Sequence, residues 1–521
     1  MALTQYAAGD LARLIAAGEV SAVEAVEQHI EQIERVNGRL NAVVVKRYDA
    51  AREEARAADR RRMEASRSGT PIPPLLGVPV TVKECLDLAG TPSTFGLGSR
   101  GAHRAERDEI HVARLREAGA IVVGKTNVAQ MLIFIEADNP VYGRTANPWN
   151  LERSCGGSSG GEGAIIAAGG STLGLGTDIG GSSRVPAAFC GIVGFKPTQG
   201  RCPDPGRWSV PFGQQAIPSQ IGLLARQVDD VILALKTING SGDPAVDGTF
   251  PLADPFVVDI AKVRVGVYNE DRSFATSPSV KRAVREAAEL LRDAGAQVVE
   301  WRPPDVRRAE ELFYGVLTSG APLYKEALGR DKRDPRVALL LTLASFSHRT
   351  ARVIGGMASA LGQKTLGRTI GLFGSRPTEA YWRLVEEVET YRTVFAAALA
   401  QSPDGPLDAV LSPASALPAI PHGASKDLGA LGGYTLLHNV LGWPAGIVPV
   451  TRVRPEEQTA RPASSDLVEK AALRAERCTT GLPLGVQISA PHWREHIVLA
   501  LMRAIQSRAQ QRPDYPSRPE L

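Results

Sequence analysis

The stretch Gly156–Thr198 reads GGSSGGEGAIIAAGGSTLGLGTDIGGSSRVPAAFCGIVGFKPT, and it contains two Gly-Gly-Ser-Ser units, which end at Ser159 and Ser183. Because glycine lacks a Cβ atom, such a backbone can take positive φ angles and come close to a ligand. Its N–H groups can then converge on one anion or oxyanion. A serine hydroxyl beside those donors has the surroundings that nucleophilic acyl chemistry needs. The stretch therefore predicts a reactive serine next to an oxyanion site.

The chain offers no nearby histidine to activate such a serine, since none lies between His111 and His348. Lys83 is the candidate base, because it follows the apolar run Leu75–Val82, which reads as a buried strand. Burial lowers the pKa of a lysine, and a neutral lysine can accept the proton of a serine. Judged by the residues alone, an ordinary salt bridge with the adjacent Glu84 remains the alternative role for Lys83.

Sequence spacing leaves open which serine of the first unit, Ser158 or Ser159, would connect Lys83 to the second unit. Asp178 and Arg184 flank the second unit, and we expect them to hold its loop through backbone hydrogen bonds or a mutual ion pair. The pattern Gly-x-Ser-x-Gly at 156–160 also fits the nucleophile elbow of α/β-hydrolases. That motif requires a strand just before it and a later catalytic histidine, and the preceding residues 147–154 do not read as a strand.

Several motifs along the chain together resemble the amidase signature family of serine hydrolases, and within it the fatty-acid amide hydrolase branch. They cover most of the chain and comprise Val82-Lys83-Glu84-Cys85, Gly124-Lys125-Thr126-Asn127, Asn147-Pro148-Trp149, the whole of Gly156–Thr198, Pro444-Ala445-Gly446, Val448-Pro449-Val450, Gly481-Leu482-Pro483 and Val486-Gln487.

The resemblance implies a Ser–Ser–Lys triad, with Ser182 as the nucleophile, Ser158 as the bridging serine after a cis peptide bond, and Lys83 as the base. It favours Ser158 over Ser159. It also implies that Leu132 lines the substrate pocket, and that the N–H groups of the nucleophile loop form the oxyanion hole; these belong to Ile179, Gly180, Gly181 and Ser182.

Composition indicates an ordinary globular enzyme. Of the 521 residues, 43% are hydrophobic and 22% charged, and the net charge of +4 is too small for the length to indicate a nucleic-acid partner. No apolar stretch is long enough for a signal peptide or a membrane span. The five cysteines lack metal-ligand spacing, so we expect no metal, no cofactor and a reducing, cytoplasmic location.

The expected fold is a single α/β domain over 1–521, with a mixed, largely parallel twisted sheet and helices on both faces. Residues 1–70 are read as N-terminal helices, and 71–300 with 375–510 as the α/β core. Residues 301–374 interrupt the strand–helix alternation and predict a helical insertion at the mouth of the active site, as a lid or pocket wall. The charged, proline-rich residues 451–474 read as a surface loop.

These features together predict a hydrolase of carboxylic amides with apolar acyl or aryl groups, acting through an acyl-enzyme, with esters and carbamates as further substrates. The apolar candidates for the pocket are Met131, Leu132, Ile133 and Phe134, together with residues 337–346 of the insertion. The alternative is the A-type component of a glutamine-dependent amidotransferase, which works with a partner chain. A homodimer and a peripheral membrane contact of the insertion stay open.

Overall fold

A mixed sheet forms the centre of the protein, for which the computed structural model describes residues 2–202, 208, 210, 213–240, 251–271, 274–458 and 461–521. Within these residues eleven strands pair in the order β1-β3-β2-β8-β10-β9-β14-β15-β13-β11-β12. The strands are β1 (Val43–Lys46), β2 (Pro79–Lys83), β3 (Ile121–Thr126), β8 (Leu173–Asp178), β9 (Val193–Lys196), β10 (Gln220–Ala225), β11 (Arg264–Val267), β12 (Gln297–Glu300), β13 (Ala409–Pro413), β14 (Ala445–Arg452) and β15 (Pro483–Ser489).

The pairing confirms a mixed α/β sheet, but the expectation that it is largely parallel is wrong. Of the ten pairings within this sheet of described strands, six are antiparallel. The reason lies in the centre, where β10 enters antiparallel between β8 and β9 and separates two strands that a helical crossover connects. Farther along the sheet, β14 and β15 add antiparallel pairs on the side of β9.

Helices cover both faces of this sheet, as the sequence predicts. One layer contains α7, α8 and α17, which contact one another through α17 and contact strands from β8 to β15. The opposite layer contains α2, α5 and α6, which contact one another through α5. The helices are α1 (Ala8–Ala17), α2 (Ala22–Leu40), α3 (Tyr48–Ser68), α4 (Ile110–Glu117), α5 (Gly160–Ala167), α6 (Arg184–Cys190), α7 (Val228–Ile238), α8 (Pro278–Asp293), α9 (Val306–Thr318), α10 (Ala321–Leu328), α11 (Pro335–Ser345), α12 (His348–Ala360), α13 (Lys364–Leu372), α14 (Thr378–Ala400), α15 (Gly433–Val440), α16 (Leu467–Ala475) and α17 (Glu495–Ala509).

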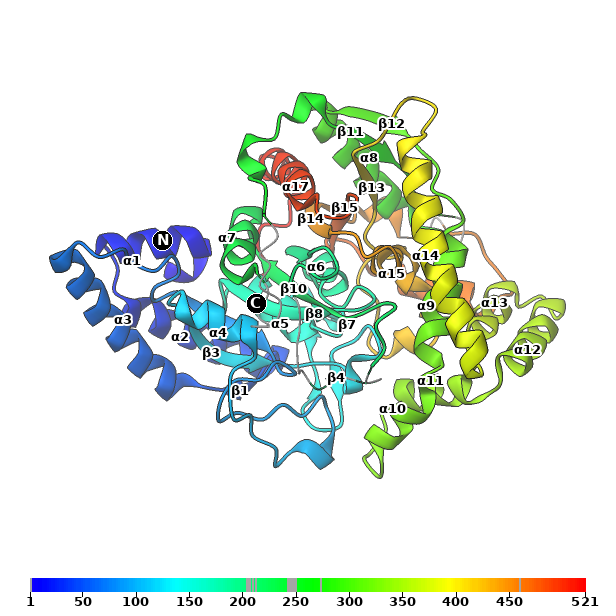
Figure 1. Ribbon diagram of the computed structural model, residues 1–521, viewed down its shortest axis with the longest axis horizontal. Helices are drawn as coiled ribbons and strands as arrows, with labels where there is room; N and C mark the ends of the chain where they lie inside the picture. Colours follow the sequence, from blue (N-terminus) through cyan, green and yellow to red (C-terminus); the bar gives the residue numbers. More distant parts are fainter. Residues whose placement is uncertain are drawn as a thin grey trace.

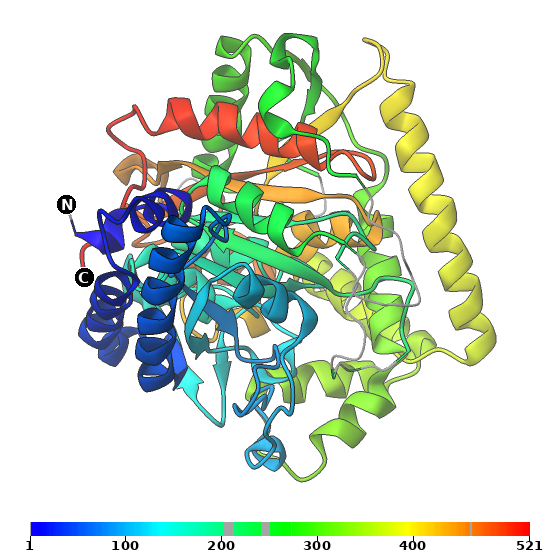
Figure 2. The same cartoon turned by 60° about the vertical axis from the view of Figure 1, so that its left-hand side comes forward.

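The two ends of the molecule are helical. Figure 1 shows α1–α3 at one end and α10–α13 at the opposite end, with the sheet between them. The long helix α14 follows this second group and stands along the outer edge of the molecule (Figure 2). Residues of the N- and C-terminal segments, among them Thr4 and Arg518, line a common surface hollow, so the chain ends lie near each other.

Local interactions explain where the first long helix begins and ends. Helix α2 starts with a capping box, in which Glu24 N donates to Ser21 Oγ (3.1 Å) and Ser21 N donates to Glu24 Oε2 (2.9 Å). The helix continues past Asn37 and Gly38 to Leu40. The side chain of Asn37 accepts hydrogen bonds from the N–H groups of Ala42 and Val43, and the left-handed Asn41 ends the helix.

Strand β3 neighbours β2 and includes part of the motif at residues 124–127. It runs to Thr126, and β2 and β1 pair with it on its two sides. At Gly124 a Cβ atom would lie 2.7 Å from Val43 Cγ1 and 2.8 Å from the carbonyl oxygen of Val45. The glycine therefore allows β1 to approach and extends the ladder.

Two further segments differ from the expected pattern. Residues 150–154 form β7 (Asn150–Ser154), which pairs with β6 (Ala146–Asn147) in a small hairpin, so the prediction of no strand before Gly156 is wrong. This strand does not belong to the central sheet. A second small hairpin joins β4 (Asp138–Asn139) and β5 (Gly143–Arg144). Within the expected loop 451–474, α16 begins at Leu467, where Asp466 caps it by accepting from Val468 N (2.9 Å).

Candidate active site

Lys83 is the last residue of β2, and its side chain is completely buried. Its Nζ donates hydrogen bonds to Ser158 Oγ (2.7 Å) and to Thr177 Oγ1 of β8 (2.8 Å). The neighbouring Glu84 accepts hydrogen bonds from the backbone N–H groups of Thr94 and Phe95, the latter at 3.0 Å. Glu84 thus fixes the turn that follows β2, while Lys83 points at the first glycine-serine loop.

The first loop separates the two candidate bridging serines by their contacts. The peptide bond between Gly157 and Ser158 is cis, as the family resemblance implies. Whereas Ser158 Oγ contacts Lys83, Ser159 Oγ donates to the carbonyl oxygen of Thr177 (3.3 Å) and accepts from its N–H (3.4 Å). Ser159 therefore joins its loop to β8, and Ser158 is the serine that lies between Lys83 and the cavity described below.

The second loop follows β8 and precedes α6, and it presents only one of its two serines to that cavity. Ser182 lines the cavity together with Ser158, Ile179 and Gly180. Ser183 is buried and donates its hydroxyl to the carbonyl oxygen of Thr177 (3.1 Å). Among the hydrogen bonds of the described residues none joins the hydroxyls of Ser158 and Ser182. The two loops do meet at the backbone, where Ser159 N donates to Ser182 O (2.9 Å).

The four expected oxyanion donors are not equivalent. Gly181 N donates to Asp178 Oδ1 (2.9 Å), so this N–H is engaged within the protein, contrary to the expectation. The N–H groups of Ile179, Gly180 and Ser182 have no acceptor among the turn, loop and side-chain hydrogen bonds of the described part of the chain. Gly181 takes a φ of 115°, and a Cβ there would lie 2.2 Å from Thr435 Oγ1, so glycine is required at this position.

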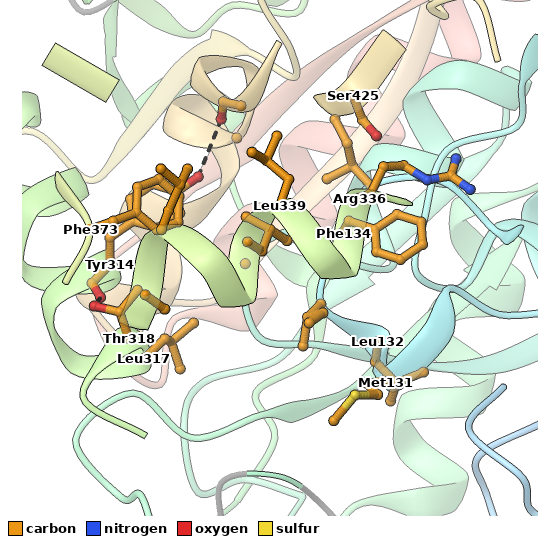
Figure 3. Close-up of a pocket in the computed structure, with 18 of the residues that line it drawn as sticks. Met131, Leu132, Phe134, Tyr314, Leu317, Thr318, Arg336, Leu339, Phe373 and Ser425 are labelled. Carbon is orange, nitrogen blue, oxygen red and sulfur yellow. Dashed lines mark hydrogen bonds between the residues drawn. The ribbon is translucent and has the colours of Figure 1, made fainter. Parts of the chain in front are cut away.

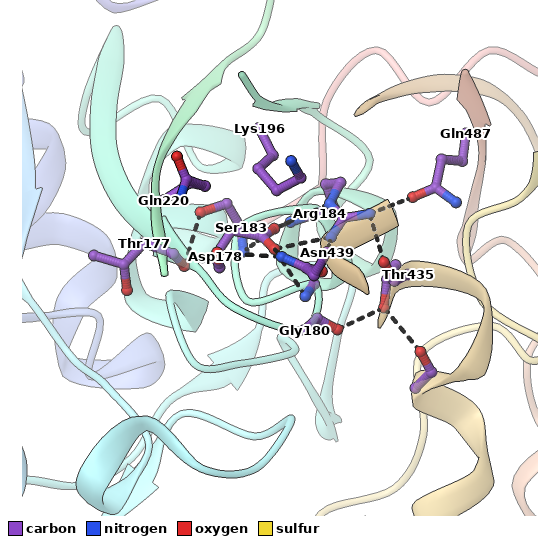
Figure 4. A network of polar contacts seen from close by, with 12 residues as sticks. Thr177, Asp178, Gly180, Ser183, Arg184, Lys196, Gln220, Thr435, Asn439 and Gln487 are labelled. Atoms are coloured by element: carbon purple, nitrogen blue, oxygen red, sulfur yellow. Dashed lines mark hydrogen bonds and ion pairs between the residues drawn. The ribbon is translucent and has the colours of Figure 1, made fainter. Parts of the chain in front are cut away.

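Asp178 and Arg184 hold the second loop through a buried ion pair, as the sequence predicts (Figure 4). Arg184 Nη2 donates to Asp178 Oδ1 (2.8 Å), and Nε donates to Oδ2 (3.0 Å). Arg184 also donates to Gln487 Oε1 (2.7 Å) and to Asn439 Oδ1 (2.6 Å). Burial alone would raise the pKa of Asp178, but the charge and hydrogen bonds of Arg184 outweigh it and hold this pKa below its ordinary range.

A cavity of about 550 Å³ opens above the two serines, and its walls are mainly apolar (Figure 3). The predicted residues Met131, Leu132, Ile133 and Phe134 all line it. Met131 and Leu132 have left-handed backbones, with φ angles of 55° and 63°, which is unusual for residues other than glycine and is found preferentially at functional sites. The insertion contributes residues of α11, namely Leu339, Leu340, Leu341, Leu343 and Ala344.

The cavity also contains residues that the sequence analysis did not single out. Helices α9 and α13, which belong to the insertion expected as a lid or pocket wall, reach it through Phe313 and Ile370, and α16 reaches it through Leu467, outside that insertion. Arg336 lies at its wall over the ring of Phe134, with a centroid distance of 4.5 Å. The pattern Asp334-Pro335 just before it is typical of a helix start and could have indicated that Arg336 is held in place there. In the structure Asp334 Oδ1 accepts hydrogen bonds from Arg336 N and Nε, both at 2.8 Å.

Glu162, within the motif itself, is a buried carboxyl in the first turn of α5. Its acidic type among glycines and apolar residues was the signal that the sequence offered.

Over the described ranges, no group of three or more His, Cys, Asp or Glu side chains is placed to hold a metal ion. The same part of the chain contains no helix with the length and apolar character needed to cross a membrane.

Comparison with known proteins agrees with this geometry. The family model for amidases matches residues 24–499. The chain is 36% identical to fatty-acid amide hydrolase 1 of Sus scrofa, over 83% of this chain and 75% of that protein. It is 32% identical to indoleacetamide hydrolase of Bradyrhizobium diazoefficiens, over 97% of this chain and 87% of that protein.

A solved structure of fatty acid amide hydrolase has the same fold, with a TM-score of 0.83 and 26% sequence identity, over 98% of this chain and 86% of that chain. The family match covers more than half of the sequence and includes both serine loops. The chain therefore belongs to the amidase family, and it is an enzyme that hydrolyses amides.

Proposed function

We propose that this enzyme hydrolyses amides with bulky apolar acyl or aryl groups by way of an acyl-enzyme on Ser182. The observation that supports this proposal most strongly is one arrangement: Lys83 Nζ lies 2.7 Å from Ser158 Oγ, and Ser158 and Ser182 both face the apolar cavity. A base, a bridging hydroxyl and a half-buried serine are thereby lined up at the end of a space that suits an apolar group.

The reaction begins with proton transfer along this line. Neutral Lys83 accepts the proton of Ser158 while Ser158 accepts that of Ser182, and Ser182 Oγ attacks the carbonyl carbon of the amide. The hydrogen bond between the two serines forms when substrate orders the Ser182 side chain, since catalytic hydrogen bonds often tighten only in the complex. The N–H groups of Ile179, Gly180 and Ser182 then stabilise the oxyanion.

Collapse of this intermediate breaks the C–N bond, and the leaving amine takes its proton from Lys83 through Ser158. A water molecule then loses a proton along the reverse path, attacks the acyl-enzyme, and releases the acid and free Ser182. Esters and carbamates share the acyl-transfer chemistry, so we propose them as further substrates. Helices α9–α13 supply much of the cavity wall and, in this proposal, form its lid.

The cavity lining favours apolar substrates over glutamine. The lining is mainly apolar, and its charged side chains are Arg336, Lys426, Asp427 and Arg474. The guanidinium of Arg336 is engaged by Asp334 and by Asp138 Oδ2 (2.6 Å). No contact among the described residues favours the amidotransferase alternative, in which ammonia would pass to a partner chain.

Covalent labelling with a fluorophosphonate tests the nucleophile. We expect one adduct on the native chain by intact mass, located on Ser182 by peptide mapping and absent from Ser182→Ala. Ser183→Ala is the matched control, since its hydroxyl is engaged by Thr177 O, and this variant should still be labelled. Absence of an adduct on the native chain, or an adduct that persists in Ser182→Ala, would refute the proposed nucleophile.

A series of anilides tests the substrate class. The rate constant kcat/KM should rise from acetanilide to anilides of longer acyl chains, because each added methylene buries more apolar surface in the cavity. Turnover of formamide-sized substrates alone would contradict the proposal.

A further inference from the structure

A buried carboxyl group faces the strand that carries Lys83. Glu162 lies four residues after Ser158, in the first turn of α5, and its side chain is inaccessible to solvent. Glu162 Oε2 accepts a hydrogen bond of 2.6 Å from Thr81 Oγ1. Glu162 Oε1 accepts one of 2.8 Å from Thr126 Oγ1, which comes from β3. This carboxyl group takes no part in the proton path through Lys83, Ser158 and Ser182.

The register of the strands places Glu162 beside the base. Thr81 and Lys83 are two residues apart on β2, so both side chains leave the same face of the strand. Thr81 contacts Glu162, and Lys83 contacts Ser158 at the start of the same helix. Across the sheet Thr81 pairs with Gly174 of β8, where a Cβ would lie only 1.9 Å from Glu162 Oε2. Gly174 thus leaves the space that the carboxyl group occupies.

The positive charge of Lys83 lowers the pKa of Glu162. Helix α5, which carries Glu162, contacts β2, β3, β8, β10, α2 and α6. The other titratable or charged side chains of these elements near the site have roles elsewhere. In α2, burial lowers the pKa of His29 to about 4, which leaves the ring neutral; in β3, Lys125 Nζ donates to Ser93 Oγ (2.9 Å); Asp178 and Arg184 pair with each other.

We infer that Glu162 is a positioning residue that controls the charge of Lys83, because the two side chains compete for one buried proton. Two arrangements contain the same number of protons: an ammonium beside a carboxylate, and a neutral amine beside a carboxylic acid. Only the second arrangement allows Lys83 to accept the proton of Ser158. Glu162 can therefore hold the proton that Lys83 must give up, so that the base is freed without moving net charge into a buried site.

The electrostatic surroundings of Glu162 agree with this role. Burial raises the pKa of Glu162 to about 8, although the hydrogen bonds from Thr81 and Thr126 and the charge of Lys83 act in the opposite direction. The carboxyl group is therefore not fixed as a carboxylate near neutral pH, and both of its protonation states are accessible there. Hydroxyl groups can donate or accept, so Thr81 and Thr126 can serve either form of the carboxyl group.

The pH dependence of kcat/KM for an anilide tests the inference. On its acidic limb kcat/KM increases with pH as Lys83 loses its proton, and the midpoint of this increase is the quantity to compare. The variant Glu162→Gln keeps the size of the side chain but is always neutral. It removes the carboxylate that stabilises the ammonium form of Lys83, so the midpoint should fall by about 1 pH unit. A purely structural role would lower kcat/KM equally at every pH and leave the midpoint unchanged, and that result would overturn the inference.

Two further variants make the test independent of whether Glu162→Gln folds. Thr126→Val removes one donor that stabilises the carboxylate, so its midpoint should move in the same direction by a smaller amount; an unchanged midpoint would again overturn the inference. Asp230→Asn is the matched control, because Asp230 is a buried carboxyl group on α7, where it accepts from Gly9 N (2.9 Å) and does not line the cavity. Its midpoint should equal that of the native enzyme.

The inference rests on the proposed role of Lys83 as the base, and the two can fail separately. If the fluorophosphonate does not label Ser182, the proposed function fails. If it labels Ser182 alone while the midpoints of the native enzyme and Glu162→Gln coincide, the proposed function stands and the inference about Glu162 is wrong.

Discussion

Replacement of Asp178 by asparagine should destabilise the protein and misplace the loop between β8 and α6 that contains Ser182. The carboxylate accepts hydrogen bonds from Gly181 N (2.9 Å) and Ser183 N (3.2 Å), on both sides of Ser182. It also neutralises Arg184, and both side chains of this ion pair are completely buried. Loss of the negative charge leaves the guanidinium buried without its counter-ion, which typically costs about 3–5 kcal/mol. We expect the free energy of unfolding at pH 7 to fall by that amount.

Urea denaturation measures this loss, and its pH dependence provides a second readout. The pKa of Asp178 is held low in the folded protein, so its ion pair contributes stability above the ordinary aspartate pKa of about 4 and loses it as the pH falls further. The native protein should therefore lose more stability than Asp178→Asn when the pH falls below about 4.

Activity should respond as well, because the loop carries both the proposed nucleophile Ser182 and the proposed oxyanion donors. At pH 7 and without urea the variant is still folded. Under these conditions kcat/KM should fall by about 100-fold or more, which is the cost of disturbing an oxyanion hole. A variant within about 1 kcal/mol of the native stability, with the native pH dependence, would refute this account of the ion pair.

Three further predictions concern other parts of the molecule. Burial raises the pKa of Asp230 to about 6, so the stability of the native protein should decrease as the pH rises through 6. Asp230→Asn should lack this decrease and be more stable than the native protein at pH 7, as measured by urea denaturation on either side of pH 6. Gly174→Ala should lower kcat/KM and thermal stability together, because its Cβ would lie 1.9 Å from Glu162 Oε2; native values for both would contradict the packing described. Leu132→Ala should raise KM for long-chain anilides by about 10-fold but leave acetanilide almost unchanged; equal effects on both would contradict a role in the acyl pocket.

The sequence predicts those features of the fold that arise from local patterns. The buried strand that leads to Lys83 and the helices of residues 1–70 both depend on residues close in sequence. The antiparallel entry of β10 between β8 and β9 depends on a strand pairing between distant segments, which alternation of helices and strands does not encode. For the same reason the alternation alone predicts a largely parallel sheet.

A similar division applies to the site. The motif and the family resemblance place Lys83, Ser158 and Ser182 at one locus, and the structure brings Lys83 into contact with Ser158. The engagement of Gly181 N by Asp178 could not be predicted, because it depends on the orientation of one peptide group in a turn. The contribution of α16 to the cavity, which comes from outside the predicted insertion, depends on how distant segments pack, and no local pattern specifies it.

Trapping the acyl-enzyme formed from an amide substrate tests whether Ser182 is the nucleophile. The enzyme is mixed with a long-chain anilide, quenched with acid during turnover, and digested for peptide mapping by mass spectrometry. We expect an acyl group on Ser182, formed by the native enzyme and by Ser183→Ala but at least about 100-fold more slowly by Lys83→Ala. An acyl group on Ser158 or Ser159, or turnover without any acylated serine, would contradict this expectation.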